Sequence, residues 1–292
     1  MSIQWYPGHM TAAKKKAEEA MEFNDVIIEV LDARIPGSST NPMIESIRSA
    51  RQRPNLKVLN KADLADPKIT EQWISYFNSQ KKTKAISLSA KKTSDVKQIL
   101  LECEKLAPHR GTNVKPLRML IMGVPNVGKS TIINALKNKR IAKVGNVPAV
   151  TKMQQRIEIT NSMILTDTPG MMWPKIANEL DGIYLAASHS IGINAYDEIE
   201  TALTLSDTLK EKYPEFLTDQ YGFKNPMPSD EEFLTHIASS RNFVIKGGRY
   251  DLLKAAVTFI NDYRSGVIGR ISLESPASRK LMLENPIQHK IS

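Results

Sequence analysis

Residues 123–130 read Gly-Val-Pro-Asn-Val-Gly-Lys-Ser, a glycine-rich loop that ends in a lysine and a hydroxyl group. Gly123 and Gly128 allow the backbone to fold around a phosphate without steric conflict from Cβ atoms. The loop follows an apolar run over 117–122 and precedes a stretch with helical spacing, so its amides would meet the phosphate at a helix N-terminus. In this context the pattern predicts a nucleotide phosphate site, and a chance match in a loop is the disfavoured alternative.

The polar groups of this loop suit phosphate chemistry. We expect Lys129 to bridge the β- and γ-phosphates, Ser130 to ligate Mg²⁺ and Thr131 to contact the α-phosphate. The full set of predicted phosphate contacts is Asn126, Val127, Gly128, Lys129, Ser130 and Thr131.

A second motif, Asn60-Lys61-Ala62-Asp63, can identify the base of the nucleotide. The carboxylate of Asp63 can accept hydrogen bonds from N1–H and from the 2-amino group of guanine, whereas adenine has an acceptor at N1 and no 2-amino group. A buried carboxylate that faces an acceptor is left unpaired, so Asp63 would discriminate strongly against adenine. Lys61 would lie along the plane of the base, and Asn60 would hold neighbouring loops together.

A third motif, Ser89-Ala90-Lys91, follows the next strand pattern, and we expect the amide of Ala90 to meet guanine O6. A four-residue base motif alone is usually just a turn. Together with the phosphate loop it predicts that the chain binds GTP or GDP and argues against an ATPase.

Two segments are candidates for nucleotide-sensing switches. Asp167-Thr168-Pro169-Gly170 would place Asp167 on Mg²⁺ through water and the amide of Gly170 near the γ-phosphate. Thr151 is the candidate for the first switch, with its hydroxyl on Mg²⁺; an ordinary loop threonine is the alternative. The predicted metal ligands are therefore Ser130, Thr151 and Asp167.

Many GTPases carry a water-orienting glutamine directly after the switch glycine, but this chain has Met171 there. A thioether cannot orient water, so we expect slow intrinsic hydrolysis and a second component that completes the site. His9 is one candidate, because an imidazole titrates near neutral pH. Alternatively, the surrounding residues 5–10 only anchor the N-terminus and leave His9 exposed. The predicted catalytic residues are His9, Lys129 and Thr151.

The order of these motifs is unusual. The base motif comes first, the phosphate loop follows, and the second switch closes the set, whereas an ordinary small GTPase begins with the phosphate loop. The same parts are present but circularly permuted, so the second switch leads directly into the C-terminal part of the chain.

Composition narrows the class of protein. Hydrophobic residues make up 41% and charged residues 24% of the 292 residues, which is typical of a globular protein with one or two cores. No apolar run approaches the roughly 18 residues of a membrane span. A single cysteine, Cys103, excludes an intramolecular disulfide and favours a reducing compartment. We therefore expect a cytoplasmic protein without a membrane partner.

Charge is unevenly distributed along the chain. Residues 1–177 hold 28 Lys and Arg against 15 Asp and Glu, residues 178–240 hold 3 against 12, and residues 241–292 hold 9 against 4. A basic front and a basic tail suit a polyanionic partner touched by two surfaces, with solvated surface charge as the alternative.

Hydrophobic patterns predict strands over 26–31, 56–59, 85–88, 117–122, 153–159 and 163–166, and helices over 41–51, 70–80, 93–106 and 129–137. This alternation indicates an α/β domain with a mostly parallel sheet and helices on both faces. Helical spacing over 199–212, 229–239 and 250–263 predicts an all-α second domain. We place the permuted GTPase domain at 1–177 and the helical, RNA-binding domain at 178–292.

The motif order, Trp5-Tyr6-Pro7-Gly8-His9-Met10 and Asp32-Ala33-Arg34-Ile35-Pro36 together resemble the circularly permuted GTPases of the YlqF/RbgA type. The C-terminal stretches 246–251 and 264–270 are also similar to that family. The resemblance implies a factor that binds the large (50S) ribosomal subunit and its rRNA, promotes late maturation, and hydrolyses GTP when the subunit stimulates it. One departure is Ala149, where the family usually has glycine before the switch threonine.

The resemblance also bears on cofactors and contacts. Mg²⁺ is expected with GTP or GDP, and Asn126 is a candidate for holding K⁺ beside the phosphates, as related GTPases do. The basic residues that we expect to contact RNA are Lys14, Lys15, Arg241, Lys246, Arg249, Lys254, Arg264 and Arg270. Alternatively, the tail charges pack on acidic residues of the GTPase domain.

A competing hypothesis is a GTP-gated binding module with little catalysis, which recruits a protein through the acidic stretch 178–240. The absent glutamine keeps this alternative open, and stimulated hydrolysis would distinguish the two. In either case we expect the chain to be a monomer.

Overall fold

A computed structural model describes residues 15, 17–139, 155–173, 176, 178–224 and 226–284. Its centre is a six-stranded sheet in the order β3-β2-β1-β4-β6-β5. The strands are β1 (Val26–Asp32), β2 (Asn55–Asn60), β3 (Thr83–Ser87), β4 (Leu117–Met122), β5 (Gln155–Thr160) and β6 (Met163–Asp167). Neighbouring strands are parallel except β5, which runs antiparallel to β6. The predicted α/β class is confirmed.

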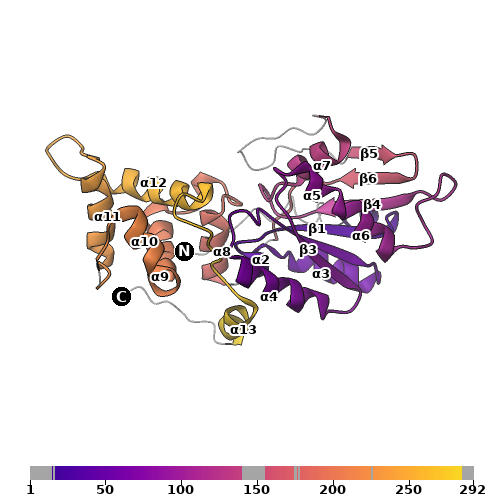
Figure 1. The fold of residues 1–292 in the computed structure, drawn as a ribbon, viewed down its shortest axis with the longest axis horizontal. Coiled ribbons are helices and arrows are strands. Elements are labelled where there is room, and N and C mark those ends of the chain that lie inside the picture. Colours follow the sequence, from indigo (N-terminus) through magenta and orange to yellow (C-terminus); the bar gives the residue numbers. More distant parts are fainter. Residues whose placement is uncertain are drawn as a thin grey trace.

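Strands β1 and β2 are buried along their whole length and β4 along most of it, because helices cover the sheet (Figure 1). The helices of this part are α2 (Pro36–Ser39), α3 (Pro42–Ala50), α4 (Pro67–Asn78), α5 (Thr93–Val96), α6 (Gln98–Leu106) and α7 (Lys129–Lys137). Helices α3 and α4 begin at capping side chains of Asn41 and Asp66, each followed by a proline that suits the first helical position. The single helix expected over 93–106 is divided into α5 and α6.

The C-terminal part is helical. It contains α8 (Glu179–Ala187), η1 (Ile193–Ala195), α9 (Glu198–Lys212), α10 (Pro214–Tyr221), α11 (Asp230–Ser240), α12 (Leu252–Ser265) and α13 (Pro276–Glu284). A capping box between Ser229 and Glu232 starts α11. Sequence patterns located α9, α11 and α12 but missed α8, α10 and α13. Helix α8 is buried on most sides, so it lacks the alternating polar face that the prediction relied on.

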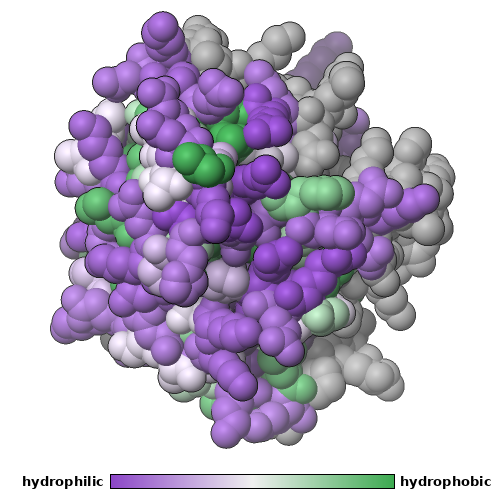
Figure 2. Space-filling view, turned by 90° about the vertical axis from the view of Figure 1, so that its right-hand side faces the viewer, coloured by the Kyte–Doolittle hydropathy of each residue, from purple (hydrophilic) through white to green (hydrophobic). Residues whose placement is uncertain are grey.

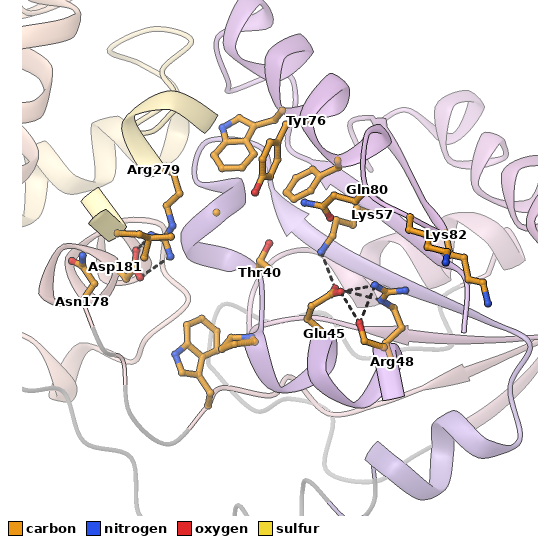
Figure 3. A pocket seen from close by; sticks show the side chains of 18 of the residues that line it. Thr40, Glu45, Arg48, Lys57, Tyr76, Gln80, Lys82, Asn178, Asp181 and Arg279 are labelled. Atoms are coloured by element: carbon orange, nitrogen blue, oxygen red, sulfur yellow. Dashed lines mark hydrogen bonds and ion pairs between the residues drawn. The ribbon is translucent and has the colours of Figure 1, made fainter. Parts of the chain in front are cut away.

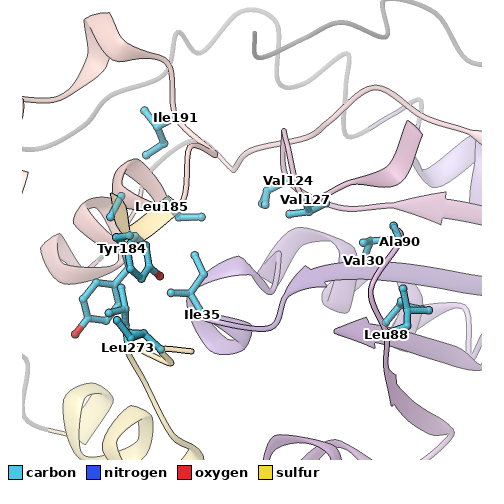
Figure 4. Close-up of a cluster of buried hydrophobic side chains, with 14 of the residues drawn as sticks. Val30, Ile35, Leu88, Ala90, Val124, Val127, Tyr184, Leu185, Ile191 and Leu273 are labelled. Atoms are coloured by element: carbon cyan, nitrogen blue, oxygen red, sulfur yellow. The ribbon is translucent and has the colours of Figure 1, made fainter. Parts of the chain in front are cut away.

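One hydrophobic cluster crosses from the sheet to the helical part (Figure 4). Ile35 and Val124 of the GTPase part belong to the same buried cluster as Tyr184, Leu185 and Leu273. Such a shared core indicates that the two parts pack directly against each other and are not separate domains joined by a flexible linker. The boundary at 177/178 stays a proposal.

The end of the molecule away from the helical part is mostly hydrophilic, with hydrophobic residues in small separate patches (Figure 2). Within the described residues, no helix is both long enough and apolar enough to cross a bilayer.

Candidate nucleotide-binding site

The described motif residues lie at the carboxyl edge of the sheet. The phosphate loop follows β4, Asp167 ends β6, Asn60 ends β2, and Ser89 lies just beyond β3. Strands β1 and β4 are adjacent although they are far apart in sequence, so the loops after them meet in the crevice where ligands bind in parallel sheets. Permutation has therefore changed the order of the motifs and not their place in the sheet.

Two glycines of the phosphate loop are required by geometry. Gly123 has φ +149°, and a Cβ there would lie 2.4 Å from the carbonyl oxygen of Val30. Gly128 has φ +102°, and a Cβ there would lie 2.2 Å from Nδ2 of Asn60. Gly128 also precedes α7, whose first-turn amides can bind an anion together with the helix dipole. The loop therefore has the backbone form of a phosphate cradle, with Ser130 and Thr131 in the first turn of α7.

The ionisable pair at this end is poorly compensated. Lys129 is buried, and its Nζ donates to the carbonyl oxygens of Gly123 (3.0 Å) and Val124 (3.1 Å). Burial lowers the pKa of Lys129 to about 8, against the opposing attraction of Asp167. Burial also raises the pKa of Asp167 to about 6, although Lys129 lowers it. Both groups are charged between these values. Among the residues that the structure describes, neither has a full set of hydrogen-bond partners, so an incoming ligand could supply more.

The residues fit a magnesium ion bound together with nucleotide. Oδ1 of Asp167 is buried without a hydrogen-bond partner in the described structure. Mg²⁺ commonly keeps several waters and takes one or two carboxylates plus substrate phosphates. The described residues contain no cluster of three His, Cys, Asp or Glu side chains that could hold a metal alone. Ser130 and Asp167 would hold the ion, and it would neutralise charge on the phosphates.

Asn60 links the phosphate loop to the base-binding loop. Its Nδ2 donates to the carbonyl oxygen of Val127 at 2.7 Å, and its Oδ1 accepts from the amide of Ala90 at 2.9 Å. The amide of Ala90, expected to meet guanine O6, therefore already has a partner and would have to share its hydrogen.

The other base-reading residues are also held by side chains. Lys91 Nζ lies 3.1 Å from Oδ2 of Asp63. Burial opposes ionisation of Asp63, but hydrogen bonds from Ser89 and Lys91 lower its pKa overall, so the carboxylate form needed for guanine is favoured. Lys61 has a left-handed backbone (φ +61°), and its Nζ donates to Oδ2 of Asp32 at 2.8 Å. The spacing of motifs did not indicate this role for Asp32.

The second switch packs on the phosphate loop. A Cβ at Gly170 would lie 2.9 Å from Cα of Pro125, and the amide of Met171 donates to the carbonyl oxygen of Gly123 at 3.2 Å. The side chain of Met171 belongs to a buried cluster with Met21 and Ile27. The position that holds glutamine in many GTPases therefore contributes to the core.

Asn126 faces the helical part. Its Nδ2 donates at 2.8 Å to the carbonyl oxygen of His189, just after α8, and its backbone is left-handed (φ +57°). Its candidate role in holding K⁺ stays a prediction. The link to His189 was not indicated by the sequence, because the two residues are far apart in the chain.

Three predicted site residues, His9, Lys14 and Thr151, lie outside the described residues, so their predicted roles stay predictions. Lys15 is exposed.

The remaining basic candidates fall into two groups. Lys246 and Arg249 are exposed on a turn between α11 and α12, where the amide of Ile245 donates to the carbonyl oxygen of Arg249. By contrast, Arg264 donates to the carbonyl oxygens of Ala186 and Ala187, and Arg270 donates to those of Ala62 and Ala65.

The guanidinium groups of Arg264 and Arg270 are thus occupied within the protein. Arg270 contacts the GTPase part through backbone carbonyls and Arg264 contacts the helical part itself, which differs from the predicted alternative of packing on acidic residues of the GTPase domain. Arg241 pairs with Asp262 at 2.8 Å, and Lys254 lies over the ring of Phe243. Of the basic candidates in the tail, the turn residues are the most available to a polyanion.

A cavity of about 900 Å³ lies away from these motifs, between α3, α4 and the start of α8 (Figure 3). Its charged lining is largely paired internally. Arg48 pairs with Glu45 and Arg279 with Asp181. Lys57 pairs with the buried Glu29, which does not line the cavity. None of the residues that line this cavity belongs to the nucleotide motifs, so the cavity is not part of the nucleotide site.

Known proteins share this arrangement. The family described as "50S ribosome-binding GTPase" matches residues 118–220, beginning in the strand that leads into the phosphate loop. "Ribosome biogenesis GTPase A" of Bacillus cereus is 39% identical over 284 residues, which are 94% of this chain and 95% of that protein. The chain belongs to the ribosome biogenesis GTPase A family. Its namesake from Thermotoga maritima is 31% identical over 94% of this chain and 95% of its own length.

A solved structure described as GNP-bound YlqF from T. maritima is similar to this chain, with a TM-score of 0.66 and 27% identity. The match covers 91% of this chain and 99% of the chain in that structure. Family membership confirms the resemblance inferred from the motifs. It also confirms that the chain is a GTP-hydrolysing enzyme of ribosome biogenesis that binds guanine nucleotide.

Proposed function

We propose that this GTPase binds rRNA of the large (50S) ribosomal subunit, promotes its late maturation, and is released when the subunit stimulates GTP hydrolysis. Mg²⁺ held by Ser130, Asp167 and Thr151 would accompany the nucleotide, with K⁺ at Asn126 as a further candidate. The observation that carries the proposal is the buried Met171 beside a complete phosphate loop. Such a site binds GTP but needs an additional group to orient the attacking water.

Contacts between the two parts support coupling of hydrolysis to release. The phosphate loop reaches α8 through Asn126 and His189, and it shares a core with Leu185. A change at the γ-phosphate can therefore alter how the helical part packs. The subunit would sense that change through the basic surfaces of both parts.

The exposed turn at Lys246 and Arg249 suits contact with rRNA phosphates. Val244, Ile245 and Tyr250 on the same turn are 53%, 43% and 42% exposed, which adds apolar and aromatic surface beside the cations. Aromatic and cationic groups together favour RNA that offers both bases and phosphates.

The second candidate is the GTP-gated binding module with little catalysis. The burial of Met171 is also compatible with this candidate, because a thioether cannot orient water. In that case the acidic stretch 178–240 would recruit a protein partner.

GTP turnover measured with and without purified large subunits, in K⁺ and in Na⁺ buffer, tests the proposal. Strong stimulation by large subunits, and none by small subunits, is the expected result. The variant Lys129→Ala gives the background rate. Tight GTP binding without stimulation by large subunits would contradict the proposal and favour the binding module.

A further inference from the structure

A buried group of three charges lies beside the base-binding loop. Asp32 is the last residue of β1 and is in register with Asn60, the last residue of β2. Its carboxylate accepts from Nε of Arg34 at 2.9 Å and from NH2 of Arg34 at 2.8 Å, and Lys61 Nζ donates to it at 2.8 Å. The side chains of Asp32 and Arg34 are 0% and 2% exposed, and that of Lys61 is 22% exposed.

The arrangement contains more positive charge than a structural pair requires. Arg34 alone makes a two-pronged pair with Asp32, which is sufficient to compensate the carboxylate. Lys61, from the loop expected to bind the base, is a second cation, and it donates to the same Oδ2 of Asp32 as Arg34 does. Burial raises the pKa of Asp32, but the attraction of Arg34 and Lys61 outweighs it and holds that pKa well below its usual range. The carboxylate of Asp32 is therefore held in its anionic form, and it fixes the end of the Lys61 side chain.

A lysine fixed at its end presents its four-carbon stem as an apolar surface. Lys61 cannot search many rotamers while its ammonium is held, so less side-chain entropy remains to be lost when a base packs on it. The left-handed backbone of Lys61 further restricts the loop. This is pre-organisation for a flat ligand.

Arg34 continues the connection to the helical part. Its NH1 lies 3.4 Å from the carbonyl oxygens of both Tyr263 and Arg264 in the last turn of α12, and its guanidinium lies 4.8 Å from the centre of the Tyr263 ring. The carboxyl end of a helix carries partial negative charge, which a cation stabilises. The amide of Leu273 also donates to the carbonyl oxygen of Arg34 at 2.9 Å, so this residue is held from two sides.

We infer that Asp32 is a positioning residue of the guanine site that acts through Lys61, and that Arg34 connects this site to the carboxyl end of α12. Occupancy by guanine, and not only the γ-phosphate, is then communicated to the helical part. The inference uses the GTPase activity of the family and is independent of the proposed ribosomal role.

The test is a double-mutant cycle in GDP affinity, measured with the purified full chain and no ribosomes. Asp32→Asn and Lys61→Met should each raise the Kd for GDP about tenfold, and the double variant should be no weaker than either single variant. A control cycle of Asp32→Asn with Ser130→Ala should instead give effects that multiply. Multiplying effects for Asp32 and Lys61 would overturn the positioning role.

Asp32→Asn leaves the buried Arg34 and the partly exposed Lys61 without their anion and can fail to fold. A second measurement therefore uses Lys61→Met, which retains the pair of Asp32 and Arg34. Saturating GDP should slow hydrogen exchange of the amides of residues 262–267 in the unaltered chain, and this slowing should be lost in Lys61→Met. As a matched control, Lys68→Met changes a lysine on α4 and should retain the slowing. An equal response in Lys61→Met and the unaltered chain would overturn the connection to α12.

Discussion

The two ends of the nucleotide site differ in how their charges are compensated. At the base end, Asp32, Arg34 and Lys61 form a closed set of ion pairs, and Asn60 uses both ends of its amide. At the phosphate end, within the part of the chain that the structure describes, Lys129 donates to backbone carbonyls of its own loop and Oδ1 of Asp167 has no hydrogen-bond partner. Burial accordingly lowers the pKa of Lys129 and raises that of Asp167, so both shifts favour the neutral forms.

The difference indicates that the two ends of the site contribute differently to nucleotide binding. The base end is organised before nucleotide arrives, so it supplies selectivity at low entropic cost. The phosphate end is completed by the ligand, so its electrostatics change most when GTP and Mg²⁺ bind. Variants at the two ends should therefore differ in size and in pH dependence.

Lys129→Ala should cause the largest loss, because it removes the cation that faces the transferred phosphate. We expect GTP turnover to fall by at least about 100-fold. Lys137→Ala, in the last turn of the same helix, is the matched control and should leave turnover within about twofold. Normal turnover in Lys129→Ala would disprove the assignment of the phosphate site.

Gly128→Ala should affect both ends, because the added methyl would meet Asn60 and the backbone is left-handed. Strain of about 1–3 kcal/mol predicts a Kd for GDP raised roughly 5- to 150-fold. Gly222→Ala has similar φ strain but open space, so it should lower stability by about 1 kcal/mol and leave GDP affinity unchanged. Fluorescence titration with GDP and thermal unfolding distinguish the two variants.

Magnesium dependence should report the raised pKa of Asp167, about 6. Mg²⁺ binds the ionised carboxylate, so its apparent affinity should be constant above pH 7 and about tenfold lower at pH 5, where the proton competes. The Mg²⁺ concentration for half-maximal effect on GDP binding measures this change. Asp167→Asn should retain only the part due to titration of the nucleotide itself; an unchanged pH profile in that variant would argue against Asp167.

The smallest expected effect lies far from both ends. Lys246→Ala combined with Arg249→Ala should weaken binding to large subunits about fivefold and reduce the slope of log affinity against log salt by about 1 to 2. GDP affinity should not change. Arg270→Ala serves as the comparison, because its guanidinium is held by carbonyls of residues 62 and 65; if it alone altered the salt slope, the turn would not be the RNA contact.

The phosphate end could be predicted from sequence because its function depends on a contiguous pattern. Residues 123–130 carry the glycines and lysine at fixed spacing, and the extent of α7 was predicted as the structure has it. The sheet was also predictable, since parallel strands buried on both faces give clear apolar runs.

The pairing at the base end could not be predicted in the same way. Asp32 and Lys61 meet only because β1 and β2 end in register, and Arg34 meets α12 across more than half of the chain. Helix α8 was missed because a helix that is buried on most sides lacks amphipathic periodicity. The hydrogen bonds of Arg264 could not be predicted either, because its partners are backbone carbonyls of a distant segment. Long-range register and backbone partners are properties of the folded chain.

The shared core has a consequence for synthesis of the chain. A ribosome releases the GTPase part first, and Ile35 and Val124 then remain without the side chains of Tyr184, Leu185 and Leu273 that cover them in the finished molecule. The GTPase part therefore spends an interval during translation with an apolar face exposed, when nascent chains are open to aggregation and to chaperones. In a recombinant fragment that ends before α8, this apolar face would stay exposed.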